Sequence, residues 1–192
     1  MRNPDHNLWG SPTQKPEAAE EITKVFDHLE EQKATIAPSL VFIDPFGFAP
    51  TPFSTIERIM RNRRCEVLIT FMFEEINRFL RHPDHPMTYD SLFGTEEWRE
   101  VLPITDPTAR RRMIHDIYRD QLVESAGIRY VRSFEMLNKG NRNDYFLFFG
   151  SNELLRLEKM KEAMWKVDPS VVRRRTSRGG LKNRGWGLGV RC

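Results

Sequence analysis

The fold class of this chain is decided by residues 40–73, which read LVFIDPFGFAPTPFSTIERIMRNRRCEVLITFMF. The stretch opens with a short apolar run at 40–43 and closes with a longer one at 65–73. Continuous apolar runs of this length are typical of strands buried on both faces, as in a parallel sheet. Between them, residues 53–60 have the apolar spacing of an amphipathic helix. Because the connection contains a helix, the two strands are predicted to be parallel.

Further predicted elements flank this unit on both sides. A first helix begins at Pro16, and its apolar face is expected to carry Ile22, Val25, Phe26 and Leu29. A loop with Pro83 and Pro86 is predicted after the second strand. Two strand patterns separated by a Gly-containing turn at 138–141 predict a hairpin. The remaining predicted elements are helices at 74–80, 95–101, 107–125 and 152–165, and the two hairpin strands at 128–137 and 144–150.

These elements predict an α/β fold, a three-layer sandwich whose sheet is mostly parallel and ends in an antiparallel hairpin. Three strands are expected to run in one direction, with the last strand antiparallel to its neighbour. Residues 16–169 form the predicted domain. We expect residues 1–15 to be a disordered N-terminus and residues 170–192 to be a disordered, basic tail rich in Gly and Arg.

Composition favours a globular protein of the cytoplasm. Hydrophobic residues make up 39% and charged residues 30% of the 192-residue chain, which is enough for one core. No apolar run approaches the roughly 20 residues of a membrane helix, and the first residues have no apolar segment typical of a secretory signal. Cys65 and Cys192 form no CxxC pair, and Cys65 is predicted to be a buried, small hydrophobic residue.

The net charge of +3 is concentrated in the tail. Residues 171–192 contain seven basic residues and no acidic residue. Removing these seven from the 30 basic residues leaves 23 against 27 acidic residues, so the remainder carries a net charge of −4. The folded part therefore lacks the basic balance of a nucleic-acid-binding domain.

Four segments in order resemble the three-Cys-motif partner (TcmP) family, which is similar to Rossmann-type class I methyltransferases. They are FIDPFGF, CEVLITFMFEEINRFL, YVRSFEMLNKGNRNDYFLFFGSN and LEKMKEAMWKVDP, within residues 40–169. The resemblance implies a partial Rossmann-like fold whose last strand slots in beside the parallel strands. It also implies S-adenosylmethionine as cofactor, a three-Cys-motif protein as partner, and nucleic acid as a candidate substrate.

The chain departs from the family at both ends. The family's N-terminal half, with its strand, glycine-rich turn and acidic residue, has no counterpart here, and residues 173–192 do not resemble the family. We therefore expect a truncated, C-terminal half of a methyltransferase-like domain that lacks the cofactor site. Independently of the resemblance, an apolar strand at 40–43 with one visible neighbour would leave an uncharged edge, which proteins normally avoid.

The resemblance assigns a catalytic role to the turn after the first strand. Asp44-Pro45-Phe46-Gly47 looks like the D-P-P-aromatic motif of amino-methyltransferases. Asp44 would accept a hydrogen bond from the target amine, together with the backbone at Pro45, and Phe46 would stack on a flat base. Gly47 and Phe48 are weaker substrate-binding candidates. The alternative is a strand-ending turn in which Asp44 caps local N–H groups.

Glu74, Glu75 and Asn77 follow the second strand and are further candidates for substrate binding. The alternative, which we prefer, is that the acids favour the first turn of a helix. His82, Asp84 and His85 lack the further ligands that zinc requires, so no metal site is predicted. His28 and His115 are expected at the surface or its boundary.

The leading functional hypothesis is an S-adenosylmethionine-dependent methyltransferase-like protein, of which this chain is an incomplete or inactive part. The first alternative is a non-catalytic partner or scaffold of a three-Cys-motif protein. The second is an RNA-binding module that uses its basic tail. The Gly-rich run at 185–189 follows no strand and precedes no helix, so it does not predict a nucleotide-binding loop. The aromatic run at 145–149 predicts core packing.

Overall fold

The computed structural model describes residues 17–32, 34, 36–44, 51–81, 86–137 and 143–167. It is a mixed α/β protein with an open sheet of four strands in the order β1-β2-β4-β3. The strands are β1 (Ser39–Ile43), β2 (Cys65–Phe71), β3 (Tyr130–Leu137) and β4 (Asn143–Ser151). The α-helices are α1 (Glu17–Glu31), α2 (Phe53–Met60), α3 (Phe73–Phe79), α4 (Pro86–Phe93), α5 (Pro107–Glu124) and α6 (Leu154–Val167), with a 3-10 helix, η1, at Glu97–Val101.

Strand pairing corrects the predicted sheet. Among the described strands, only β1 and β2 pair in parallel, whereas β4 is antiparallel to both β2 and β3. The sheet is therefore mostly antiparallel by pairing, not mostly parallel. The cause is the place of β4, which lies between β2 and β3 and separates them. Even so, β1, β2 and β3 run in the same direction, and β4 alone runs against them, as the sequence predicted.

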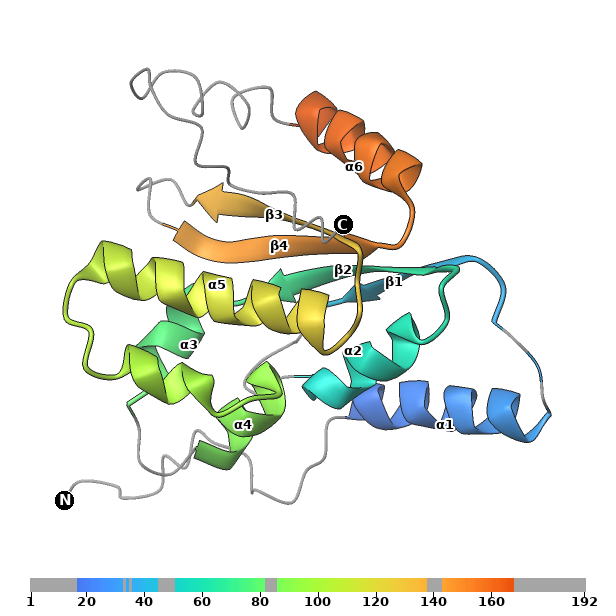
Figure 1. The fold of residues 1–192 in the computed structure, drawn as a ribbon, viewed down its shortest axis with the longest axis horizontal. Coiled ribbons are helices and arrows are strands. Elements are labelled where there is room, and N and C mark those ends of the chain that lie inside the picture. Colours follow the sequence, from blue (N-terminus) through green and yellow to red (C-terminus); the bar gives the residue numbers. More distant parts are fainter. Residues whose placement is uncertain are drawn as a thin grey trace, which may run out of the picture.

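Helices lie on both faces of the sheet (Figure 1). Helices α2 to α5 cover one face, with α1 beside α2, and α6 packs on the other face over β3 and β4. Two separate groups of buried residues correspond to these two faces. The group under α6 contains Phe134, Phe149 and Leu157, with Met160 and Met164 packed against it. The helix predicted at 152–165 thus corresponds to α6.

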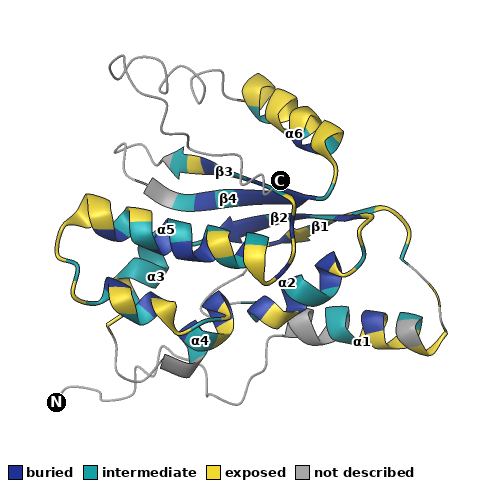
Figure 2. Cartoon of the chain, in the orientation of Figure 1, coloured by how far each residue is buried: buried dark blue, intermediate teal, exposed yellow. Residues whose placement is uncertain are grey.

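The larger core is built around Tyr118 of α5, which is 1% exposed. Its ring lies 4.4 Å from the ring of Phe71 and 5.2 Å from that of Phe148, measured between centroids. Phe53 and Phe93 meet the same ring edge-on at 6.0 and 6.2 Å. Aromatic rings from two strands and three helices thus meet at one point, and Figure 2 shows the buried stripe of α5 that faces the sheet.

Two predicted elements differ in detail. Pro86 begins α4 rather than marking a loop, because proline also fits the first turn of a helix. The helix predicted at 95–101 is the shorter η1.

Val25 does not lie on the buried face of α1, since the residue is 53% exposed, whereas Phe26 is buried as predicted. Cys65 is buried as predicted. Residues 1–15 and 170–192 lie outside the described residues.

Two glycines adopt backbone angles that favour glycine, and they make a matched pair for mutation. Gly94 has φ +69°, and Gly127, which lies between α5 and β3, has φ +65°. A Cβ at Gly94 would lie 2.7 Å from Cδ1 of Phe53, whereas a Cβ at Gly127 would meet nothing within 4 Å.

We expect Gly94→Ala to lower the free energy of unfolding by more than Gly127→Ala does. Each substitution costs about 1–2 kcal/mol for the left-handed backbone, and Gly94→Ala adds about 1–3 kcal/mol because Phe53 must move. Urea unfolding of both variants measures the difference. Equal losses would show that Phe53 does not confine Gly94.

Candidate functional site

The carboxyl ends of β1, β2 and β3 lie along one edge of the sheet, at the left in Figure 1. In open α/β sheets, ligands bind outside this edge. Asp44 follows β1 directly and is exposed, and α3 follows β2 after one residue. Pro45, Phe46, Gly47 and Phe48 lie outside the described residues. The predicted stacking role of Phe46 therefore stays a prediction.

Glu74 and Glu75 lie in the first turn of α3 and are half-buried. Carboxylates at this position are stabilised by the positive end of the helix dipole. The preferred interpretation from sequence, a favourable helix start, accounts for their placement. Both side chains nevertheless belong to the helix that begins at the carboxyl edge of the sheet.

The side chain of Asn77 is hydrogen-bonded to a buried arginine. Its Oδ1 accepts a hydrogen bond of 2.6 Å from Nε of Arg110, a residue of α5 that is only 9% exposed. A second bond of 3.4 Å runs from Nη1 of Arg110 to the carbonyl oxygen of Ile104. Burial, and then the charge of Arg81, lower the pKa of Arg110. Sequence reasoning missed Arg110, because arginines on a helix usually face solvent.

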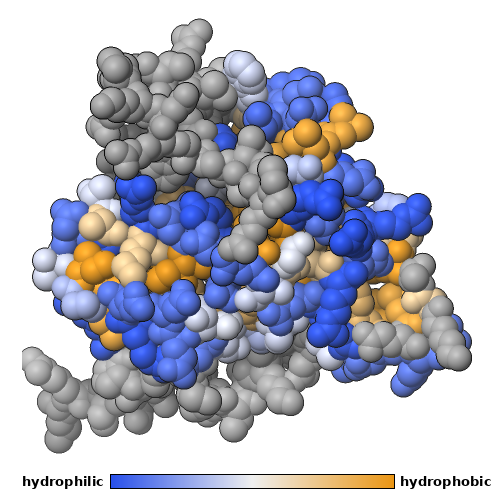
Figure 3. Space-filling model, viewed as in Figure 1, coloured by the Kyte–Doolittle hydropathy of each residue, from blue (hydrophilic) through white to orange (hydrophobic). Residues whose placement is uncertain are grey.

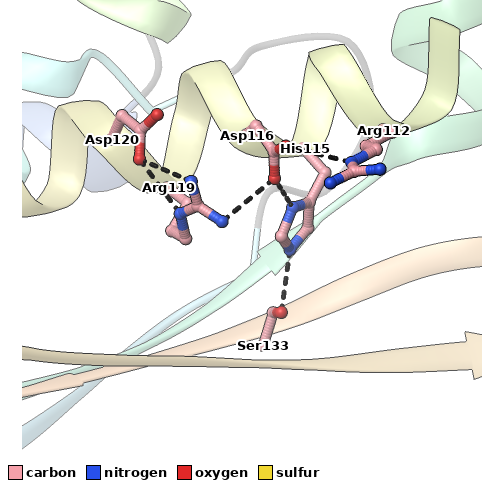
Figure 4. Close-up of polar contacts among 6 residues, drawn as sticks. All are labelled: Arg112, His115, Asp116, Arg119, Asp120 and Ser133. Atoms are coloured by element: carbon pink, nitrogen blue, oxygen red, sulfur yellow. Dashed lines mark hydrogen bonds and ion pairs between the residues drawn. The ribbon is translucent and has the colours of Figure 1, made fainter. Parts of the chain in front are cut away.

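A second polar group joins α5 to β3 (Figure 4). His115 is 4% exposed, so its expected place at the surface was wrong, whereas His28 is exposed as expected. Nε2 of His115 lies 2.8 Å from Oγ of Ser133, and Nδ1 lies 2.9 Å from Oδ1 of Asp116. The imidazole also stacks on the ring of Phe148 at 5.1 Å. The surrounding aromatic core explains its burial.

Ser133, His115 and Asp116 contact one another in the same order as the residues of a hydrolase triad. Their geometry, however, does not support that chemistry. Nucleophilic catalysis needs a serine that substrate can reach and donors for the developing oxyanion. Here Ser133 lies on a strand beneath α5, and its hydroxyl points to a buried imidazole. Asp116 is shared with Arg119, at 3.1 Å, and Arg112, at 3.6 Å. Ser133, His115 and Asp116, called the His115 clip below, therefore link α5 to β3.

The His115 clip predicts a pH dependence of stability. Burial lowers the pKa of His115 below its ordinary value of 6.5, and the hydrogen bond to Asp116 only partly opposes this effect. The native imidazole thus stays neutral at a pH where the unfolded one takes up a proton. Stability is full above about pH 6.5 and falls as pH decreases below it.

We expect the wild-type chain to lose about 1 kcal/mol of unfolding free energy between about pH 7.5 and about pH 5.5 through His115. His115→Gln should show a smaller loss over the same interval, measured by urea unfolding at both values. His28→Gln, at an exposed position on α1, is the control. If His115→Gln keeps the full pH dependence, His115 is not its source.

A cavity of 380 Å³ opens at the opposite end of the sheet. The residues that line it precede β2 and β3 or follow β4, so it lies at the amino ends of the parallel-running strands. Its lining combines two arginines, one acid, one asparagine, one glycine and two apolar side chains. They are Arg63, Val123, Gly127, Ile128, Arg129, Asn152 and Glu153. It is thus separate from the carboxyl edge that carries Asp44.

The described residues do not fit an S-adenosylmethionine site. Such a site in a Rossmann-like fold needs a glycine-rich turn between a strand and a helix. Within the described ranges, the glycines are Gly94 after α4, Gly127 before β3 and Gly150 inside β4, and none occupies such a turn. Nor does this part of the chain hold three His, Cys, Asp or Glu side chains placed to bind a metal. His82, Asp84 and His85 lie outside it.

Comparison of the chain with protein-family models, with curated proteins and with solved structures found no match. Among the described helices, none combines the length and apolar character needed to cross a membrane.

Proposed function

We propose that the chain is the acceptor-side part of a methyltransferase-like assembly of three-Cys-motif partner type. In this proposal a second polypeptide supplies the S-adenosylmethionine site, and the present chain supplies the residues that orient the methyl acceptor. The observation that carries the proposal is the strand arrangement. Three strands run in one direction, and β4 is inserted antiparallel between β2 and β3. The sheets of class I methyltransferases, which the sequence resembles, end in the same way.

Among the described strands, none pairs with the outer edge of β1, and this edge supports an assembly. Leu40 and Phe42 are 53% and 58% exposed, although both belong to the apolar run of the strand. They pair in register with Glu66 and Leu68, and Leu68 packs against the core under α6. The exposed pair therefore lies on the α6 face of the sheet, beyond the reach of α6, which packs over β3 and β4.

The residues of β1 carry none of the features that usually protect an edge strand. Its sequence, SLVFI, has no charge and no proline. We assign this edge to a strand of an α/β partner polypeptide, because such a strand would extend the sheet and its side chains would cover Leu40 and Phe42. Figure 3 shows further apolar surface over the N-terminal end of α6, where Leu154 and Leu155 are exposed.

At the carboxyl edge, Asp44 would accept a hydrogen bond from the amine of the acceptor. Holding the amine in one orientation lowers the entropic part of the barrier. S-adenosylmethionine would supply the methyl group when it is bound by the partner. Asn77 has a structural role in this proposal, since its side-chain oxygen already holds Arg110.

The proposal is tested by mixing the chain with the N-terminal half of a longer protein of this family type, with and without a three-Cys-motif protein, and measuring complex formation and S-adenosylmethionine binding by calorimetry. We expect a complex that binds the cofactor, and we expect Phe42→Lys to weaken the complex. Val25→Lys is the matched control, because Val25 is 53% exposed and belongs to α1, which packs beside α2. A complex without cofactor binding would overturn the enzymatic proposal and favour a scaffold. No complex would overturn both.

A further inference from the structure

Two arginines lie close together beside the carboxyl edge, and no acid of the described residues pairs with either of them. Arg81 follows α3, one helical turn after Asn77, and its Nη2 donates to the carbonyl oxygen of Leu102 at 2.8 Å. Arg110 donates to Asn77 and to the carbonyl oxygen of Ile104, two residues after Leu102. Both guanidinium groups are thus tied to the same short segment between η1 and α5.

The charges of this pair are not balanced by nearby carboxylates. In the described part of the chain, neither Arg81 nor Arg110 forms an ion pair with an acid, and their charges act on each other. Burying a cation without a counter-charge is unfavourable, and so is bringing two like charges together. An anion bound between them would remove both costs.

Free N–H donors remain available for such an anion. A guanidinium carries five N–H groups, and the hydrogen bonds above use two of those on Arg110 and one on Arg81. Among the described residues no nitrogen of Arg110 is both buried and without a partner, so solvent reaches Nη2, the nitrogen that the two hydrogen bonds leave unused. Arg81 is exposed. The guanidinium of Arg110 is therefore held in place by Asn77. The exposed guanidinium of Arg81 can move to contact a ligand.

We propose that Arg81 and Arg110 form a binding site for a phosphate group. Two convergent guanidinium groups match the multiple oxygens and the charge of phosphate better than a single carboxylate. The site goes beyond the proposed function, because it needs neither the partner nor S-adenosylmethionine. The phosphate could belong to a small molecule or to a nucleic-acid backbone, and the two sources share this chemistry.

The test is a calorimetric titration of inorganic phosphate into the full chain at constant ionic strength. We expect saturable binding that Arg81→Ala weakens at least about tenfold, since hydrogen bonds between charged groups are the strong ones. Arg81 is the first position to change, because its exposed side chain lets the variant fold. Arg112→Ala is the control, since Arg112 lies two residues after Arg110 and its side chain is 69% exposed.

Absence of phosphate binding, or an equal loss in Arg81→Ala and Arg112→Ala, would overturn the proposal. A short single-stranded oligonucleotide distinguishes the two sources of phosphate. If the oligonucleotide competes with inorganic phosphate, and this competition is lost in Arg81→Ala, the result would support the site and identify a phosphodiester ligand. Binding of inorganic phosphate without such competition would support the site and identify a small ligand. Wild type and Arg81→Ala have the same basic tail, so any phosphate binding by the tail contributes equally to both titrations.

Discussion

Replacement of Tyr118 by alanine is expected to lower the free energy of unfolding by about 3–5 kcal/mol, the range found for large aromatic residues in cores. The ring of Tyr118 is the common neighbour of Phe53, Phe71, Phe93 and Phe148, so its removal leaves a cavity that no single neighbour can fill. Urea or thermal unfolding followed by circular dichroism measures the loss.

Two controls separate packing from other effects. Tyr118→Phe keeps the ring and should cost much less than Tyr118→Ala. Trp165→Ala removes a large aromatic side chain from α6 that is 54% exposed, and it should change stability little. A loss at Tyr118 no greater than that at Trp165 would contradict the central place of Tyr118 in the core.

Replacement of Asn77 by alanine is expected to lower the free energy of unfolding by about 2 kcal/mol, because hydrogen bonds to charged groups contribute about 1.5–3 kcal/mol. The variant leaves Nε of Arg110 without its acceptor in a site that is 9% exposed. Asn77→Asp retains the oxygen and adds a charge opposite to that of Arg110, so it should keep the stability. Equal losses in both variants would exclude the hydrogen bond as the cause.

Apolar periodicity was enough to predict the strands and most helices. The runs at 40–43 and 65–73 predicted a parallel pair, and β1 and β2 form it. The Gly-containing turn predicted a hairpin, and β3 and β4 pair antiparallel. Apolar content could not show that Leu40 and Phe42 are exposed, because the same run fits a central strand and an edge strand. The difference depends on neighbouring strands, not on the strand itself.

The buried polar residues could not be predicted in the same way. His115 contacts Ser133 across 18 positions, and Arg110 contacts Asn77 across 33. Neither pair has a characteristic spacing, because the partners are brought together by the packing of α5 against the sheet and α3. Asp44, by contrast, was located by its place after a strand, and it is exposed at the predicted edge. Its partners in the turn, Pro45 to Phe48, lie outside the described residues.

We propose that this chain carries the acceptor side of a methyltransferase-like sheet and that another polypeptide supplies the cofactor site. The most direct test is calorimetric titration of S-adenosylmethionine into the chain alone, after circular dichroism has confirmed folding. We predict no saturable heat of binding from the folded chain, since the glycines of its described part do not form a cofactor-binding turn. Saturable binding by the chain alone would contradict the claim, because the site would then be complete without a partner.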